Sequence, residues 1–371
     1  MTSHSFQNNR HYLVSKQELS QLLCAFAIAI LAFNFLLYAF FKVGINKNIL
    51  RFSAAILLFF SIALGKKRSV IEIILVFFAL YMMLVNGNLS QNLAFILLIV
   101  IALPSNAEKT WKNLSYIHLL LAGLVVICIV LGIVPNMITN YGGRIRRTLG
   151  FTNTNAAAIF FYSCVVTWLA QKSRIRWFDV VVPIAIIALV YRMTDSRTAI
   201  VCALLLYFTL FIISKWHNKI AAFSLCLIEL SFFVLPLFSG LLFKLFPQLD
   251  IVLSYRLRLY SNYINAHSFL SLLLGGSNVK EIDNFFLCLL FNGGLPFYLF
   301  VIGLCLFTTW TNVLKENSKE TAIILSTLAF GMMESGVIRC EILCMVLFWY
   351  LITRCIKKDQ QDEPAVAEQI L

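Results

Sequence analysis

Three arginines fall within four positions of GGRIRRTLGFTNTNAAA, the stretch from Gly142 to Ala158. They are Arg144, Arg146 and Arg147, and small residues that indicate a helix start follow them. A guanidinium group is always charged, and its planar fork of donors matches the oxygens of a phosphate. Charges held at a membrane usually face a cavity, a partner or a substrate. The cluster therefore predicts a site for a phosphate-bearing ligand, unless these side chains simply reach the phosphates of lipid headgroups.

A second group of polar residues lies in LSYRLRLYSNYINAHSFLSLLLGG. This segment belongs to the longest stretch outside the predicted membrane spans, from about residue 241 to residue 283. Arg258, Asn262 and Asn265 share one face of a helix, and leucines and an isoleucine provide much of the opposite face. Such a pattern is typical of an amphipathic helix that lies at the membrane surface. Its polar face can meet water and headgroups, or it can cover a cavity. Loops of this length are usually functional or disordered.

The carboxylate of Asp283 opens the next apolar stretch, EIDNFFLCLLFNGGLPFYLF. Asp283 or Asn284 is expected to cap the helix that begins there, and capping does not exclude a chemical role for the carboxylate. Gly293, Gly294 and Pro296 interrupt the same stretch and predict a kink or a break. Broken helices are tolerated at membrane depth where they line a cavity.

The elements that must position these residues are membrane helices. The chain has 371 residues, of which 60% are hydrophobic and only 13% are charged, so it is far more apolar than an average soluble domain. Its apolar runs suit helices that cross a bilayer. We predict one all-α polytopic domain over residues 1–371 with 11 or 12 spans, near residues 20–41, 49–64, 70–85, 92–104, 116–134, 155–170, 177–190, 198–213, 220–240, 285–310, 320–333 and 338–353.

The distribution of basic residues predicts the orientation. With residues 1–19 and the tail 354–371 in the cytoplasm, the inside connections are rich in lysine and the 241–283 loop lies outside. The basic residues left on the outside are mostly arginines: Arg51, Arg144, Arg146, Arg147, Arg192, Arg197, Arg256, Arg258 and Arg339. Lysine suffices to orient helices, so the outside arginines predict a ligand there.

Several other functions are excluded or disfavoured. The net charge of +13 reflects the basic flanks of membrane helices, so we expect no nucleic-acid partner. The ten cysteines show no metal-like spacing, and neither a phosphate-binding loop, a HExxH zinc motif nor a GxSxG nucleophile motif occurs. We therefore expect neither a metal nor a cofactor.

Taken together, four stretches resemble the polysaccharide polymerase and O-antigen ligase superfamily of bacterial envelopes, which includes Wzy-type polymerases and WaaL-type ligases. These stretches are RTLGFTNTNAAA, DSRTAIV, YRLRLYSNYINAHSFLSLLLGG and DNFFLCLLFNGGLPFYLF. The first is similar to a family pattern of Arg, Gly and Asn-Pro-Asn, with Thr154 in the place of the proline. The second resembles a Ser-Arg-Thr helix start, here Ser196 to Thr198. The resemblance covers roughly residues 140–300.

The resemblance implies a metal-independent glycosyltransferase in the bacterial plasma membrane, with both termini in the cytoplasm. It would join oligosaccharide repeat units that are linked to polyprenyl diphosphate, and these would serve as both donor and acceptor. Membrane lipids, a flippase and a chain-length regulator are the other partners implied. WaaL-type ligases have a histidine where this chain has Asp283, and this departure favours a polymerase over a ligase.

The resemblance and the chemistry together assign roles to the residues. Fixed cations can stabilise the departing diphosphate without a metal. The residues expected to be catalytic are Asp283, Arg147, Arg197 and Arg258. Asp283 would activate the acceptor hydroxyl, with His267 as the second choice. The substrate-binding group expected is Arg144, Arg146, Arg256, Asn153, Asn155, Asn284 and His267. Asn153 and Asn155 are also expected to cap their helix.

Two other functions remain open from the sequence. A ligase would transfer finished glycan to a different acceptor. A transporter or flippase for lipid-linked oligosaccharides would also need arginines for the diphosphate, but it should show related halves and charges along a central pathway.

Overall fold

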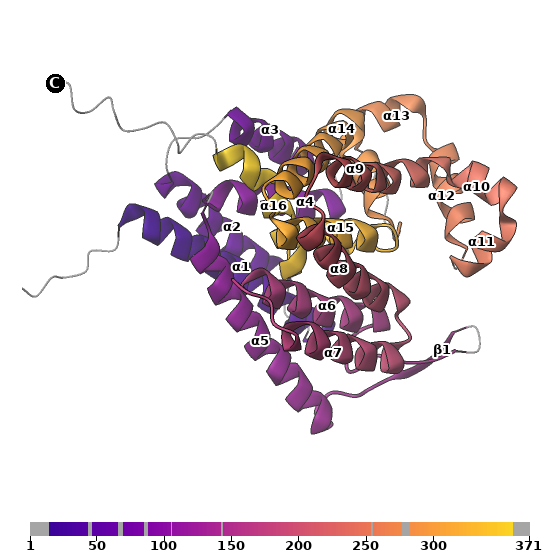
Figure 1. Cartoon of the computed structure of the whole chain (residues 1–371). Helices are drawn as coiled ribbons and strands as arrows, with labels where there is room; N and C mark the ends of the chain where they lie inside the picture. Colours follow the sequence, from indigo (N-terminus) through magenta and orange to yellow (C-terminus); the bar gives the residue numbers. More distant parts are fainter. Residues whose placement is uncertain are drawn as a thin grey trace, which may run out of the picture.

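The structure is a computed structural model that describes residues 15–43, 47–65, 70–84, 88–104, 106–141, 144–253, 255–276 and 282–358. Within these residues the chain forms a bundle of α-helices with one β-hairpin (Figure 1). The first half of the chain contains α1 (Lys16–Ala39), α2 (Lys47–Leu64), α3 (Val70–Leu84), α4 (Asn88–Ala102), α5 (Glu108–Val130), β1 (Ile138–Tyr141), β2 (Arg144–Arg147), α6 (Thr154–Ala170) and α7 (Phe178–Thr194). The second half contains α8 (Arg197–Lys215), α9 (Lys219–Val234), η1 (Leu235–Phe238), α10 (Ser239–Leu245), α11 (Pro247–Val252), α12 (Arg256–Ala266), α13 (Phe269–Leu274), α14 (Phe285–Leu314), α15 (Ser318–Gly331), η2 (Ser335–Ile338) and α16 (Leu343–Lys358).

The fold is that of an all-α membrane protein. In the described part of the chain, five helical stretches are long and apolar enough to cross a membrane: α1, α5, α8, α14 and the continuous stretch Lys219–Leu245. Shorter apolar helices lie in α2, α3, α4, α6 and α16. Each of the apolar segments expected from the sequence overlaps a helix, although α5 begins at Glu108 rather than near residue 116. Its polar first turns stay helical because Thr110, Trp111 and Leu114 are buried there.

The core of the bundle sits around α6, α14, α15 and α16. These helices bury side chains on all sides, as expected for helices surrounded by other helices. The outer helices α2 and α3 instead expose large apolar residues, among them Phe52, Phe59 and Phe77. An exposed apolar surface of this kind suits contact with hydrocarbon rather than with water.

The predicted break in α14 is confirmed. Gly294 has φ 73° and ψ 173°, a non-helical conformation that only glycine adopts without strain. A side chain at Gly294 would also collide with the carbonyl oxygen of Leu273, at 2.6 Å. The break therefore lets α13 pack against α14, and the amide of Gly276 donates to the carbonyl of Asn292 across this contact (3.2 Å).

The stretch before α14 forms a lobe of short helices. In Figure 1, α10, α11 and α12 project together from one end of the bundle. α12 has the amphipathic pattern expected from the sequence, because Leu257 and Tyr260 are buried while Arg258, Asn262 and Asn265 are exposed.

The β-hairpin was not expected from the sequence. β1 and β2 pair antiparallel, with Ile138 opposite Arg147 and Asn140 opposite Ile145. Side chains alternate between the two faces of a strand, so Arg146 and Arg147 point to opposite faces of this hairpin. Residues 1–14 and 359–371, which contain most of the predicted cytoplasmic ends, lie outside the described residues.

Candidate functional site

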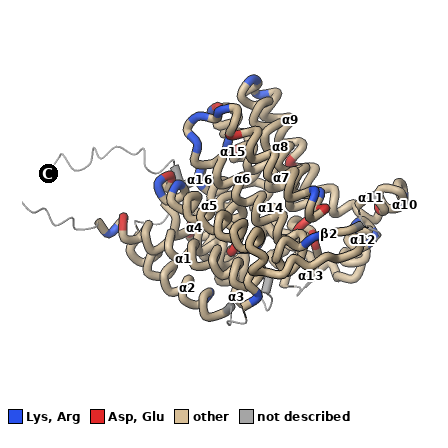
Figure 2. The backbone as a smooth tube through the Cα atoms, turned by 90° about the horizontal axis from the view of Figure 1, so that it is seen from below, with Lys and Arg blue, Asp and Glu red and all other residues tan. Residues whose placement is uncertain are grey.

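Charged residues gather at one end of the bundle where five chain segments meet. The segments are β2, the start of α6, the α7–α8 junction, the start of α12 and the turn that follows α15, with the start of α14 beside them. Figure 2 shows both signs of charge in the region of β2, α7 and α12. The side chains involved are Arg146, Asn155, Ser196, Arg256, Asp283 and Glu334, which we call the arginine–glutamate cluster.

Arg146 is held by the end of one helix and the start of another. Its Nε donates to the carbonyl oxygen of Thr194 at 3.0 Å, and its Nη2 donates to Asn155 Oδ1 at 3.2 Å. The Thr194 carbonyl lies at the C-terminus of α7, because Asp195 takes a left-handed conformation (φ 50°) that ends the helix. The last carbonyls of a helix lack helical partners and carry partial negative charge, so they attract a guanidinium group.

Asn155 connects the arginine to a carboxylate. Its Oδ1 accepts from Arg146 and from Ser196 Oγ (3.4 Å), and its Nδ2 donates to Glu334 Oε1 at 2.8 Å. The amide is presented at this point because Asn153 caps α6, with its side chain accepting from the amide of Ala156 at 2.7 Å. Of the two asparagines, Asn153 therefore caps the helix and Asn155 contacts the cluster.

Glu334 lies in the turn after α15, and only 14% of its side chain is exposed. Burial and the nearby Asp283 carboxylate raise the pKa of Glu334 from its ordinary value of 4.5 to about 7, against the opposing effect of Arg256, Arg339 and Arg146. Burial disfavours the charged form of a carboxylate, and this is the largest cause. A carboxyl group with this pKa exchanges protons near neutral pH.

Arg256, the first residue of α12, stands between the two carboxylates. Its Nη2 is 3.8 Å from Asp283 Oδ2 and 3.9 Å from Glu334 Oε1, and its Nη1 lies 3.5 Å from the sulfur of Met333. Both ion pairs are longer than a hydrogen bond between charged groups, which is about 2.7–2.9 Å. The guanidinium group is therefore close to two carboxylates without being fixed by either.

Hydrogen bonds from Asn284 and Tyr260 hold the turn that carries Glu334 and the start of α14. Asn284 caps α14 by accepting from the amide of Leu287 (3.0 Å), and its Nδ2 donates to the carbonyl of Met332 at 3.0 Å. Tyr260 OH donates to the carbonyl of Asp283 at 2.8 Å. Asn284 and Tyr260 are buried, so they position Glu334 and Asp283 from behind. Asn284, and not Asp283, is the helix cap.

The structure does not bring all the predicted residues together. Arg147 and Arg197 are exposed. Arg258 pairs with Asp250 (3.7 Å) and lies over Phe243, within the lobe. The remaining predicted residues are Arg144, which begins β2 and whose side chain lies outside the described part, and His267, which ends α12.

His267 is remote from the cluster along the same helix. Its Nδ1 lies 2.7 Å from the carbonyl of Tyr263, and its ring packs on Phe291 at 4.4 Å. At 1.5 Å per residue, it is about 16 Å along α12 from Arg256. Ser196 lies at the N-cap position of α8, but its side chain makes no capping hydrogen bond and contacts Asn155 instead.

Glu334 was missed by sequence reasoning. The signal available was an acidic residue within MMESGVIR, the break between two apolar runs that were assigned to separate helices. Nothing in that break indicates which of the other connections it contacts, because those connections are far away in the sequence.

A second polar region lies in the interior, at the other end of the α15–α16 connection. Glu341 forms an ion pair with Arg51 of α2, whose Nε donates to it at 3.0 Å, and Arg51 Nη2 also donates to Asn92 Oδ1 at 2.9 Å. The two charged side chains are 12% and 9% exposed.

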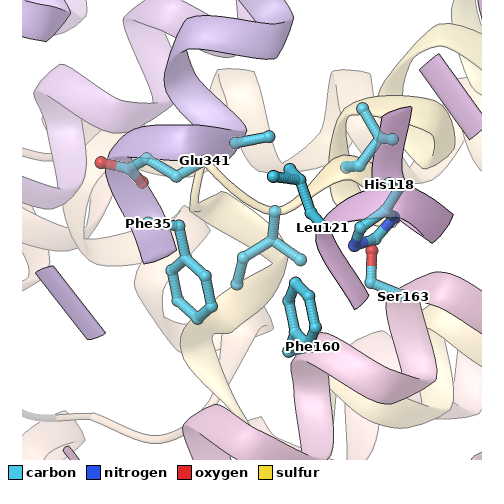
Figure 3. Close-up of a pocket in the computed structure, with 9 residues that line it drawn as sticks. Phe35, His118, Leu121, Phe160, Ser163 and Glu341 are labelled. Atoms are coloured by element: carbon cyan, nitrogen blue, oxygen red, sulfur yellow. The ribbon is translucent and has the colours of Figure 1, made fainter. Parts of the chain in front are cut away.

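A cavity of about 10 Å³ adjoins this region, between α1, α5, α6 and the start of α16. Figure 3 shows Phe35 and Phe160 among the residues that line it, with Glu341 and His118 on opposite sides. It has room for about one water molecule, so it is far too small for a sugar or a diphosphate. His118 Nδ1 lies 3.2 Å from Thr167 Oγ1, and this contact ties α5 to α6.

The arginine–glutamate cluster can bind anions and exchange a proton. The guanidinium group of Arg256 offers a fork of donors, Arg146 adds a second fixed positive charge, Asn155 and Ser196 offer further polar atoms, and Glu334 offers a carboxyl group that titrates near neutral pH. Among the described residues, no group of three or more His, Cys, Asp and Glu side chains is arranged to hold a metal ion.

Comparison of the chain with known protein families, with characterised proteins and with solved structures found no match.

Proposed function

We propose that the chain is a polysaccharide polymerase, which joins polyprenyl-diphosphate-linked oligosaccharide repeat units by glycosyl transfer on the outer face of the bacterial plasma membrane. The observation that supports this most directly is the meeting of Arg146 and Arg256 around one carboxylate at one end of an apolar helix bundle. The four stretches that resemble the polymerase and ligase superfamily contain Asn155, Ser196, Arg256 and Asp283 of the arginine–glutamate cluster, whereas Arg146 and Glu334 lie outside them.

The chemistry of the reaction fits this arrangement. Breaking the bond between the sugar and the phosphate develops negative charge on the diphosphate, which is already a good leaving group. Fixed cations in a partly desolvated site stabilise that charge without reorganising, so a metal is unnecessary. Arg256 is suited to this task because its present ion pairs are long and a phosphate can replace them.

The lipid part of the substrate fits the same end of the molecule. The lobe that carries Arg256 exposes large apolar residues, among them Leu241, Leu245 and Ile251, and a polyprenyl chain has the same apolar character. The lobe of α10 to α12 lies next to the cluster in sequence and in space, since Arg256 begins α12. In the proposed topology the spans number about 12, the lobe and the β-hairpin are extracytoplasmic, and both termini are cytoplasmic.

The test uses the purified full chain with polyprenyl-diphosphate-linked repeat units as the only glycan. Longer lipid-linked chains are expected. No product until a distinct acceptor is added would indicate a ligase. Movement of the lipid across vesicles without any new glycosidic bond would indicate a transporter. Either result would overturn the polymerase proposal.

The topology is tested separately with a reporter placed after Tyr141 or within residues 241–283. Both positions should report as extracytoplasmic. A cytoplasmic signal at either position would place the arginines on the wrong side for this reaction.

A further inference from the structure

Two carboxylates stand beside Arg256, and they are held very differently. Glu334 Oε1 accepts a 2.8 Å hydrogen bond from Asn155, and its turn is fastened by Asn284. The Asp283 side chain is 56% exposed, and Arg256, at 3.8 Å, is its described ion-pair partner. An exposed carboxylate with one long ion pair is free to change rotamer, whereas the hydrogen bond from Asn155 holds the Glu334 carboxylate in one orientation. A base that is held in one position acts on a bound hydroxyl more effectively.

We propose that Glu334, rather than Asp283, accepts the proton of the acceptor hydroxyl during glycosyl transfer. The inference rests on the proposed function. Glu334 Oε1 is occupied by Asn155 while 14% of the side chain stays exposed, so the carboxylate is both fixed and reachable. Asp283 then adds negative charge beside Glu334 and lies 3.8 Å from Arg256.

The surroundings of Glu334 suit a base that works near neutral pH. A general base acts best when its pKa lies close to the working pH, because it is then ionised and still basic. The raised pKa of Glu334, about 7, meets this condition. The titratable and charged groups that face it from the neighbouring elements are Asp283, Tyr260, Arg256, Arg146, Arg339 and Cys202.

The position of Arg256 links substrate binding to this basicity. Arg256 lowers the pKa of Glu334 in the ligand-free structure, from 3.9 Å away. A diphosphate that binds Arg256 would neutralise that effect and bring negative charge of its own. Both changes raise the affinity of Glu334 for a proton, so the carboxylate becomes a stronger base only when the donor is present.

Glycosyl transfer forms one bond, breaks one bond and moves one proton. The acceptor oxygen forms a bond to the anomeric carbon of the donor, and the bond from that carbon to the phosphate oxygen breaks. The electron pair of the broken bond leaves with the polyprenyl diphosphate, beside Arg256 and Arg146. The proton of the acceptor hydroxyl passes to Glu334, which returns it to water before the next cycle.

The experiment compares wild-type protein with the Glu334→Gln, Glu334→Asp and Asp283→Asn variants, and Glu316→Gln serves as the matched control. Glu316 is 67% exposed in a different connection, between α14 and α15. Turnover is measured with lipid-linked repeat units extracted from cells that lack the gene, between pH 5.5 and pH 8.5. Binding is measured separately with a fluorescent polyprenyl diphosphate.

Wild-type kcat/KM should rise with pH and level off above about 7, because Glu334 of the donor-free protein must be ionised, and kcat should level off at a higher pH. Glu334→Gln should lower turnover by about 10²–10⁴-fold and remove this rise. Its binding of the fluorescent lipid should be no weaker than that of wild type, since the amide can still accept from Asn155 and no negative charge at this position opposes the diphosphate. Glu334→Asp should retain more turnover than Glu334→Gln, and Glu316→Gln should behave as wild type.

Three outcomes overturn the inference. Wild-type turnover in Glu334→Gln would remove Glu334 as the base. A loss of binding in parallel with turnover would make Glu334 a structural support only. A pH rise that disappears in Asp283→Asn and persists in Glu334→Gln would return the role to Asp283. If wild-type protein itself lengthens no chains, the proposed function fails first.

Discussion

Glu334 and Glu341 lie at the two ends of the same connection, between α15 and α16, and each faces an arginine from a distant part of the chain. Two nitrogens of Arg51 donate hydrogen bonds to Glu341, and one of them also donates to Asn92. Glu334 lies 3.9 Å from Arg256, beyond hydrogen-bond distance, and shares it with Asp283. The first pair is held by direct hydrogen bonds and the second is not.

The difference shows how a membrane protein can use the same two residue types for two purposes. A buried pair that is held by direct hydrogen bonds is committed to the fold, and removing one partner leaves an uncompensated charge. A cluster with long ion pairs gains little stability from them, and the guanidinium group of Arg256 can exchange these pairs for a ligand. We therefore assign Arg51 and Glu341 to the fold, and Arg256 and Glu334 to the site.

The largest expected effect is on the free energy of unfolding, at the hydrogen-bonded pair of Arg51 and Glu341. Arg51→Met should lower the free energy of unfolding by about 3–5 kcal/mol, because Glu341 would remain buried and unpaired. The double variant Arg51→Met, Glu341→Leu should recover most of this loss, since no charge is left behind. Unfolding of the purified protein in detergent by urea or heat measures both. A single variant as stable as wild type would mean that the pair contributes little to the fold.

The next effect is on turnover, at the long ion pair of Arg256 and Glu334. Arg256→Gln should lower turnover by about 10²–10³-fold, as expected for loss of one group that stabilises the leaving charge. Its unfolding free energy should change by no more than about 1 kcal/mol, because the lost ion pairs are long. Arg174→Gln, an exposed arginine in the connection between α6 and α7, is the control. Loss of stability in Arg256→Gln as large as in Arg51→Met would abolish the distinction between the two pairs.

A smaller effect concerns stability against pH. The folded protein holds the pKa of Glu334 at about 7, above the ordinary 4.5, so the folded state binds more protons than the unfolded state between these values. Stability contributed by this group is therefore present below pH 4.5 and is lost as pH rises to 7. Glu334→Gln should remove the loss and be more stable than wild type at pH 8, by up to about 3 kcal/mol. Equal melting temperatures of the two proteins at pH 8 would contradict the assignment, and Glu316→Gln is the control.

Part of this site could be predicted from the sequence. Arg146, Asn155, Arg256 and Asp283 were all expected there, and the structure does place them together. The cap at Asn284 and the break at Gly294 were also predictable, because capping and helix breaking depend on residues next to each other in the chain. The amphipathic helix α12 follows from its spacing alone.

The rest depends on contacts between distant segments. Glu334 becomes part of the site only because the turn after α15 meets the start of α6, and no local pattern contains that information. Arg258 was expected at the site, but it pairs with Asp250 in the lobe, a contact that depends on how α11 and α12 pack. The hairpin does have a local signal, since two glycines separate β-branched residues in MITNYGGRIRR.

The hairpin provides the smallest and most local prediction, a contrast between two adjacent arginines. Arg146 donates to Thr194 and Asn155, while Arg147 on the opposite face of β2 is exposed. Arg146→Lys keeps the charge and loses the fork, so it should lower turnover by about tenfold, the value of one net hydrogen bond to a charged group. Arg147→Lys should lower turnover several times less, with similar protein levels in the membrane. If Arg147→Lys is the more damaging change, a face of the hairpin outside the cluster contacts the substrate. The role expected for Arg147 from the sequence would then stand, and the boundary of the site would have to include both faces of β2.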